Sequence, residues 1–195
     1  MIGASTGGPS ALHEVLSGLP VELGAPVLIV QHMPPTFTRI FADRLRQSTG
    51  FDVSEAAGDE PLQPGRVLVA PGGRHLTVSG REATARAIVG DGPPENACRP
   101  SIDALFRAAA ASFGDRVLAV VLTGMGVDGL RGCEAVRRAG GQVVVQDEAT
   151  SVIASMPGAV AQAGLADAIL PLTALGPELA RRIGWRRRAA GGGAR

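Results

Sequence analysis

The stretch VLAVVLTGMGVDG, residues 117–129, joins six consecutive apolar residues to a loop rich in glycine. An apolar run of this length is too short for a helix, and it does not alternate with polar residues. Continuous runs are typical of strands that are covered on both faces, as in parallel sheets. Runs of the same character recur at residues 27–30, 67–69 and 143–145. The sequence therefore predicts a mainly parallel sheet that is buried on both sides.

Helical patterns separate these runs. We expect helices at residues 9–18, 36–48, 101–112, 129–139, 157–163 and 173–184. In the third of these, Ile102, Leu105, Phe106 and Ala109 repeat at the spacing of one buried helical face. The regular alternation of strand and helix predicts a doubly wound, Rossmann-like α/β fold with helices on both faces of the sheet.

Two segments depart from this alternation. Residues 74–90 have the pattern of a β-hairpin, which we expect to form an antiparallel edge of the main sheet. Only Met1 and Ile2 precede the glycine-rich segment at Gly3, so we expect a first strand that is truncated at its N-terminus. Residues 1–185 are expected to form one domain, and the tail at 186–195, which contains only Arg, Ala and Gly, is expected to be disordered.

Composition excludes several classes of function. The 19 basic residues are all arginine, so no lysine can form a Schiff base, a Ser–Lys dyad or a P-loop contact. The four arginines in residues 186–195 exceed the formal net charge of +1, which leaves the body acidic and argues against a nucleic-acid partner. No run of about 18 apolar residues and no signal peptide is present, so we expect a cytoplasmic protein without membrane insertion.

The residues that could bind metal are few and scattered. Cys98 and Cys133 are far apart, and the three histidines show no close metal-ligand spacing, so the sequence predicts no structural zinc site. We interpret both cysteines as reduced, buried spectators, with a disulfide between them as the alternative. No cofactor-binding motif is present, and Gly3–Gly7 does not match the dinucleotide fingerprint because Ser5 holds the position of its second glycine.

Three polar residues follow predicted strands, at the edge where open α/β sheets bind ligands. Ser5 lies in a G-x-S-x-G pattern, which is typical of a nucleophile elbow but equally of a tight turn or an anion-binding loop. His32 ends a strand and suits a general base, although a hydrogen-bonded edge histidine is the simpler interpretation. Asp128 follows another strand and could instead cap the next helix. Together they predict a Ser-His-Asp triad.

Six blocks of sequence carry a resemblance to a known family. The blocks are IGASTGG (2–8), QHMPPTFT (31–38), EPLQPGRVLVAPGGRHL (60–76), RPSIDALF (99–106), LTGMGVDG (122–129) and QDEATSVIASMPGAV (146–160). In this order they resemble the bacterial chemotaxis protein-glutamate methylesterases. The resemblance implies Ser5 as nucleophile, His32 as base and Asp128 as the residue that orients the base. We expect the backbone N–H groups of Met125 and Thr6 to stabilise the oxyanion.

The resemblance also implies a substrate and partners. Members of the family hydrolyse γ-glutamyl methyl esters on the cytoplasmic helices of methyl-accepting chemotaxis receptors, and also deamidate certain receptor glutamines. The family's regulatory receiver domain has no counterpart in this sequence, so a receiver domain is expected only in a longer parent protein. We interpret His75 and Arg99 as structural or peripheral. The alternatives are an esterase of the same fold that acts on another protein, and an inactive module that binds an anion or another ligand.

Overall fold

The computed structural model describes residues 1–184. Its main element is a seven-stranded sheet with the order β10-β9-β8-β1-β2-β5-β3, in which all neighbouring strands are parallel. The strands are β1 (Ile2–Ala4), β2 (Val27–Gln31), β3 (Asp52–Glu55), β5 (Arg66–Val69), β8 (Leu118–Val121), β9 (Gln142–Gln146) and β10 (Ala168–Leu170). The four apolar runs of the sequence form β2, β5, β8 and β9, as predicted, and the tail predicted at 186–195 lies outside the described residues.

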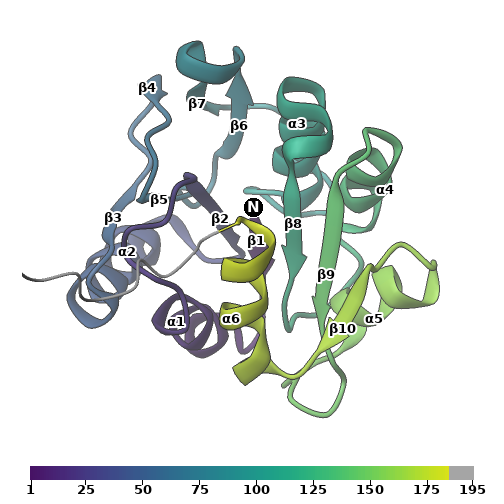
Figure 1. Cartoon of the computed structure of the whole chain (residues 1–195). Coiled ribbons are helices and arrows are strands. Elements are labelled where there is room, and N and C mark those ends of the chain that lie inside the picture. Colours follow the sequence, from purple (N-terminus) through teal and green to yellow (C-terminus); the bar gives the residue numbers. More distant parts are fainter. Residues whose placement is uncertain (185–195) are drawn as a thin grey trace, which may run out of the picture.

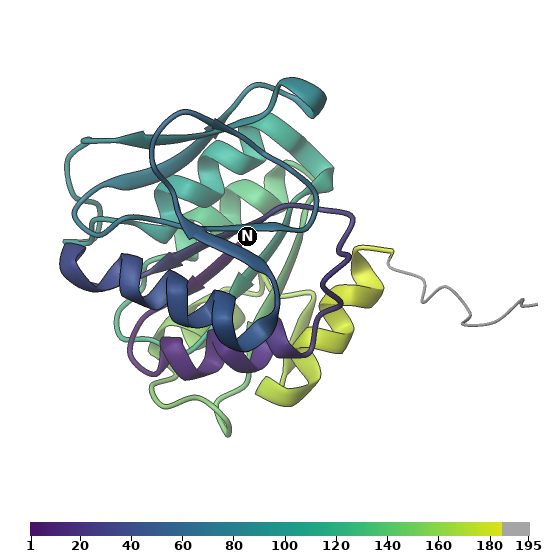
Figure 2. The same ribbon diagram turned by 90° about the vertical axis from the view of Figure 1, so that its left-hand side faces the viewer.

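Helices cover both faces of this sheet (Figures 1 and 2). One face packs against α1 (Gly8–Ser17), α2 (Pro35–Thr49) and α6 (Leu172–Arg182), and the other against α3 (Ile102–Phe113), α4 (Leu130–Arg138) and α5 (Ser155–Gln162). Successive strand residues alternate between the two cores: Ile29 belongs to the first, and Leu28 and Val30 belong to the second. Burial on both faces explains why the strands read as unbroken apolar runs, and the doubly wound prediction is confirmed.

The predicted hairpin forms, but its expected position was wrong. Strands β6 (His75–Ser79) and β7 (Arg86–Gly90) pair in antiparallel register and flank a short 3₁₀ helix, η1 (Glu82–Thr84). With β4 (Glu60–Pro61) they form a separate three-stranded sheet instead of an edge of the main one. The physical reason is packing. Leu76, Val78 and Ala87 are buried in the same core cluster as the apolar residues of α3, so the small sheet packs its apolar side chains into that core.

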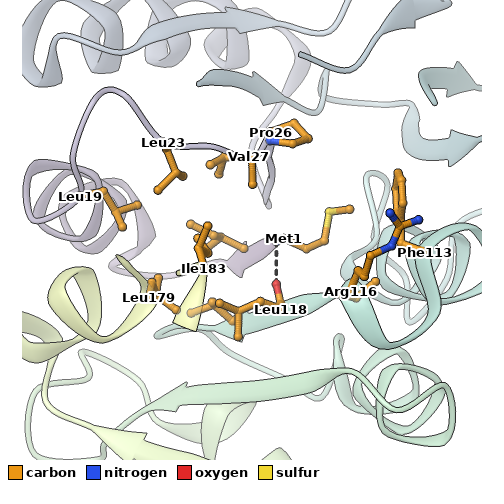
Figure 3. A pocket seen from close by; sticks show the side chains of 14 residues that line it. Met1, Leu19, Leu23, Pro26, Val27, Phe113, Arg116, Leu118, Leu179 and Ile183 are labelled. Carbon is orange, nitrogen blue, oxygen red and sulfur yellow. Dashed lines mark hydrogen bonds between the residues drawn. The ribbon is translucent and has the colours of Figure 1, made fainter. Parts of the chain in front are cut away.

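A partly open pocket of about 150 Å³ lies at the amino ends of the central strands (Figure 3). Its lining is mostly apolar and includes Leu19, Leu23, Phe113 and Leu179. The N-terminal amine of Met1 lies at this end of the sheet and donates a hydrogen bond to the carbonyl of Leu118 at 2.8 Å. Burial lowers the pKa of this amine from 8.0 to about 5. In a polypeptide that begins at Met1, this lowered pKa favours the neutral amine in the folded state near pH 7.

The carboxyl ends of the strands form the opposite edge, where the order of the strands reverses. The chain builds β2, β5 and β3 on one side of β1 and later places β8, β9 and β10 on its other side. Connections diverge at such a switch point and leave a crevice for ligands. At Gly3 a Cβ would lie 2.5 Å from the Ile102 side chain, so glycine allows the N-terminus of α3 to approach this edge closely.

Across residues 1–184, no helix combines the length with the apolar character that crossing a bilayer requires.

Candidate active site

Strand register places Ser5 beside His32. Ala4 of β1 and Gln31 of β2 are paired, and each is followed by one of the two site residues. The backbone N–H of His32 donates to the Ala4 carbonyl at 3.1 Å. The side-chain amide of Gln31 donates to the carbonyls of both Ser5 and His32, at 2.9 and 3.1 Å. The buried Gln31 side chain therefore links, by hydrogen bonds, the two loops that carry the predicted nucleophile and base.

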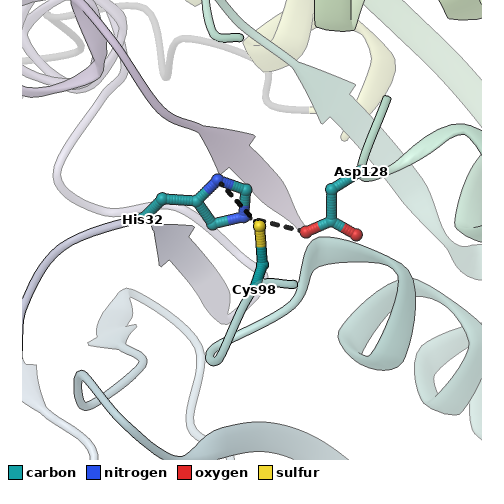
Figure 4. A group of neighbouring side chains, drawn as sticks. All are labelled: His32, Cys98 and Asp128. Atoms are coloured by element: carbon teal, nitrogen blue, oxygen red, sulfur yellow. Dashed lines mark hydrogen bonds and ion pairs between the residues drawn. The ribbon is translucent and has the colours of Figure 1, made fainter. Parts of the chain in front are cut away.

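His32 and Asp128 are in direct contact. The Nε2 atom of His32 lies 2.8 Å from Oδ2 of Asp128, as Figure 4 shows. The histidine side chain is 15% exposed and the aspartate side chain is 2% exposed, so the pair lies at the boundary between core and solvent. A carboxylate is only an acceptor when ionised, which assigns the proton to Nε2 and leaves Nδ1 with a free lone pair. His32 is thus arranged to accept a proton at Nδ1.

Asp128 is fixed at the N-terminus of α3. Its Oδ2 accepts the backbone N–H of Ile102 at 2.7 Å, and its Oδ1 accepts the backbone N–H of Asp103 at 3.1 Å and the Ser101 hydroxyl at 2.8 Å. Burial acts to raise the pKa of Asp128, but the hydrogen bonds from His32, the two backbone N–H groups and Ser101 outweigh it and hold the pKa below the ordinary value. The carboxylate is therefore charged at neutral pH.

The glycine-rich loop after β8 lies against Ser5. The backbone N–H of Ser5 donates to the carbonyl of Thr123 at 3.0 Å, and a Cβ on Gly124 would lie 2.7 Å from the Ser5 Cβ. Within residues 1–184, the N–H groups of Met125 and Thr6 donate to no protein acceptor, which leaves both available to a ligand. Met125 is 70% exposed, so this part of the loop lies at the surface.

The Ser5 hydroxyl itself has no hydrogen-bond partner among the described residues. The structure thus brings His32 and Asp128 into contact and places Ser5 next to them, without a bond between Ser5 and His32. Contacts between nucleophile and base are often long in enzymes without substrate.

Comparison with known proteins identifies the family. The model of the CheB methylesterase family matches residues 1–179. This chain belongs to the CheB methylesterase family. A protein-glutamate methylesterase/protein-glutamine glutaminase of Nocardioides is 54% identical over 183 residues, which cover 94% of this chain and 50% of that protein. A protein of the same name from Trichodesmium erythraeum is 50% identical over 183 residues, which cover 94% of this chain and 52% of that protein.

A solved structure agrees with the fold. The crystal structure of the Thermotoga maritima CheB methylesterase catalytic domain superposes with a TM-score of 0.90 at 37% identity. The match covers 93% of this chain and 96% of that domain. The chain spans about half the length of the curated relatives that it matches.

Sequence reasoning missed the hydrogen-bond network behind Asp128. Asn96 donates its side-chain amide to Oδ2 of Asp103 at 2.8 Å and to Oδ1 of Asp128 at 3.1 Å. Asp103 in turn accepts the backbone N–H groups of Gly129 and Gly132, at 2.9 and 2.6 Å. Asp128 therefore does not cap α4, which was one interpretation of the sequence; it binds the N-terminus of α3, and Asp103 binds that of α4.

The interpretation of Cys98 as a buried spectator was wrong. Its Sγ atom lies 3.7 Å from Nδ1 of His32, and the residue is partly exposed. Burial raises the pKa of the Cys98 thiol, and the charges of Asp128 and Asp103 add to the effect. The loop of residues 91–101 delivers this cysteine without a preceding strand of the main sheet, so the edge rule did not select it. Cys133 is fully buried, as predicted.

His75 and Arg99 make hydrogen bonds to the backbone of the loop near the site. His75 is buried; its Nε2 contacts the carbonyl of Pro93 at 2.9 Å, and its Nδ1 accepts the backbone N–H of Ser101 at 3.2 Å. With both nitrogens bound to backbone groups, His75 holds the loop in place. Arg99 donates to the carbonyl of Gly92 at 3.1 Å within the same loop.

Proposed function

We propose that this chain removes methyl groups from γ-glutamyl methyl esters on the cytoplasmic helices of methyl-accepting chemotaxis receptors, and that Ser5, His32 and Asp128 carry out the reaction. The observation that carries this proposal is the pairing of His32 with a buried, charged Asp128 directly beside Ser5. The names of relatives about 50% identical to this chain, which are protein-glutamate methylesterases/protein-glutamine glutaminases, support the substrate class.

The first half of the reaction forms an acyl-enzyme. Ser5 Oγ attacks the ester carbonyl while its proton moves to Nδ1 of His32, and Asp128 stabilises the resulting imidazolium through Nε2. The backbone N–H groups of Met125 and Thr6 stabilise the oxygen that becomes negative. The C–O bond to the methoxy group then breaks, and methanol leaves with the proton from His32.

The second half restores the enzyme. A water molecule gives a proton to His32 and attacks the glutamyl-serine ester, and the serine oxygen leaves with that proton. The receptor glutamate is released as a carboxylate. A glutamine side chain can follow the same route with ammonia as leaving group, so we propose deamidation of receptor glutamines as a second reaction of this site.

The test uses receptor that has been methylated enzymatically. Methanol release is expected from the unmodified chain and not from Ser5→Ala, whose circular dichroism should match that of the parent. Ser10→Ala is the matched control, because this serine lies exposed on α1 beside the same loop. A serine-directed fluorophosphonate should label the parent and the Ser10→Ala variant only.

Three results would overturn the proposal in different ways. Undiminished methanol release by Ser5→Ala would remove the nucleophile. Labelling of Ser5 together with no release from any methylated receptor would point to an esterase that acts on another protein. Absence of both labelling and release would favour a binding module.

A further inference from the structure

The peptide group that joins Gly124 to Met125 is held by its carbonyl oxygen. This oxygen accepts the Ser155 hydroxyl at 3.0 Å and the backbone N–H of Met156 at 3.1 Å. The peptide bond is trans, so its C=O and its N–H point in opposite directions. The two hydrogen bonds to the first turn of α5 therefore turn the Met125 N–H away from that helix, and this N–H donates to no acceptor within residues 1–184.

The Ser155 hydroxyl also holds the next peptide group. Its oxygen accepts the backbone N–H of Gly126 at 3.2 Å. A serine hydroxyl has one proton to donate and lone pairs with which to accept, and here both capacities are used. One side chain thus binds the carbonyl before Met125 and the N–H after it.

These contacts matter because glycine lies on both sides of Met125. Gly126 adopts a φ of +96°, in the region that favours glycine, and glycine restricts the rotation of the neighbouring peptide groups less than any other residue. Steric exclusion therefore does not fix the direction of the Met125 N–H. The hydrogen bonds to the peptide groups on either side have to fix it, and Ser155 contributes to both.

The second expected oxyanion donor shows the same arrangement. The Thr6 N–H belongs to the peptide group whose carbonyl is that of Ser5. This carbonyl accepts the backbone N–H of Gly8, the first residue of α1, at 2.8 Å and the side-chain amide of Gln31 at 2.9 Å. In both peptide groups, one polar side chain and one N–H from the start of a helix anchor the carbonyl. The N–H on the opposite side stays free for a ligand.

We propose that Ser155 is a positioning residue, whose hydroxyl directs the Met125 N–H toward the oxygen that becomes negative during ester hydrolysis. The inference rests on the proposed function, in which this N–H stabilises the oxyanion. Donors whose direction is fixed before the reaction stabilise that charge without reorganisation. Ser155 therefore affects kcat through the orientation of one peptide group and not through contact with the reacting atoms.

Two variants and a matched control test this role in methanol release from methylated receptor. Ser155→Ala should lower kcat by about five- to twentyfold, less than the loss of about 10²–10³ expected when a donor is removed, and should change KM by less than about twofold. Ser155→Thr keeps the hydroxyl and should restore most of the rate. Ser151→Ala should keep the parent rate, because this hydroxyl lies in the same segment but donates to the carbonyl of Asp147.

A double-mutant cycle and a reaction without receptor separate positioning from general damage to the fold. Met125→Pro removes the N–H on which Ser155 acts, so adding Ser155→Ala to it should lower the rate by less than about twofold. In fluorophosphonate labelling, Ser5 Oγ attacks phosphorus and displaces fluoride, and the phosphonyl oxygen gains negative charge in between. Ser155→Ala should slow this labelling by about five- to twentyfold as well.

Equal kcat values for Ser155→Ala and Ser151→Ala would overturn the proposal, as would a full further loss when Ser155→Ala is added to Met125→Pro. A raised KM with unchanged kcat would also overturn it, because that result indicates direct contact between Ser155 and the receptor. Labelling that depends on Ser155, in a chain that releases no methanol from any methylated receptor, would support the positioning role and refute the receptor as substrate.

Discussion

Oδ1 of Asp128 accepts the backbone N–H of Asp103 at 3.1 Å, while Asp103 accepts the backbone N–H of Gly129, the residue after Asp128, at 2.9 Å. Each carboxylate thus binds the segment that carries the other. A helix N-terminus leaves unpaired N–H groups and a partial positive charge, so both contacts are favourable. The pairing joins α3 and α4 and fixes Asp128 relative to His32.

The Asp103 contacts predict a large effect on stability. Asp103→Ala leaves the buried N–H groups of Gly129 and Gly132 without an acceptor. We expect the free energy of unfolding to fall by about 2–4 kcal/mol, measured by urea denaturation. Asp43→Ala is the control, because its ion pair with Arg46 lies on the exposed surface of α2, and we expect a change below about 0.5 kcal/mol there. Equal effects in the two variants would contradict the reciprocal pairing.

Replacing Asp128 tests the orientation of the base. In Asp128→Asn the amide can donate to His32, which favours the tautomer with the proton on Nδ1 and removes the acceptor that Ser5 needs. We expect kcat for methanol release to fall by about 10⁴. The side chain keeps its size, so receptor binding should change little, and a KM that rises while kcat is preserved would argue against this role.

The fold was predictable where strands are buried on both faces, because such strands form unbroken apolar runs in the sequence. The strands β2, β5, β8 and β9 are covered on both faces and appear as apolar runs. Strands β3 and β10 lie at the two edges of the sheet and are only partly buried. The prediction missed both: β3 contains no apolar run, and the apolar run of β10 is only three residues long. The hairpin was visible from its pattern, but a strand pattern does not reveal which sheet it joins.

The residues of the site also fall into those that a sequence pattern reveals and those that it does not. Ser5, His32 and Asp128 each follow a strand, so the edge rule selected them before any resemblance was used. Asn96, Cys98 and Ser101 come from an irregular loop, and Asp103 from a helix, so no local pattern places them beside the triad. Their position depends on how α3 packs across the sheet, which is a tertiary property.

The loop after β8 allows a test of the oxyanion donor with a matched pair of variants. Met125→Pro removes the backbone N–H, whereas Met125→Ala keeps it and removes only an exposed side chain. We expect kcat to fall by roughly 10²–10³ in the proline variant and to change much less in the alanine variant. Circular dichroism and thermal melting would verify that both remain folded. Equal rates for the two would exclude this N–H as a donor.

The buried amine of Met1 predicts how stability depends on pH in a polypeptide that begins at this residue. Burial lowers its pKa from 8.0 to about 5 in the folded state. Between these values the unfolded chain binds a proton that the folded chain does not, so stability falls as pH decreases from 8 to 5 and levels off below 5. A difference of about 3 pKa units corresponds to about 4 kcal/mol in the free energy of unfolding.

Urea denaturation at pH 5, 6, 7 and 8 would measure this dependence. A second chain with additional residues before Met1 is the control, because its Met1 nitrogen is an amide that does not titrate, while the residues from Ile2 onward are the same in both chains. The difference between the two chains isolates the amine and should grow steadily as the pH is lowered. Parallel curves would mean that the amine escapes to solvent and remains protonated, and the contact with the Leu118 carbonyl would then contribute no pH dependence.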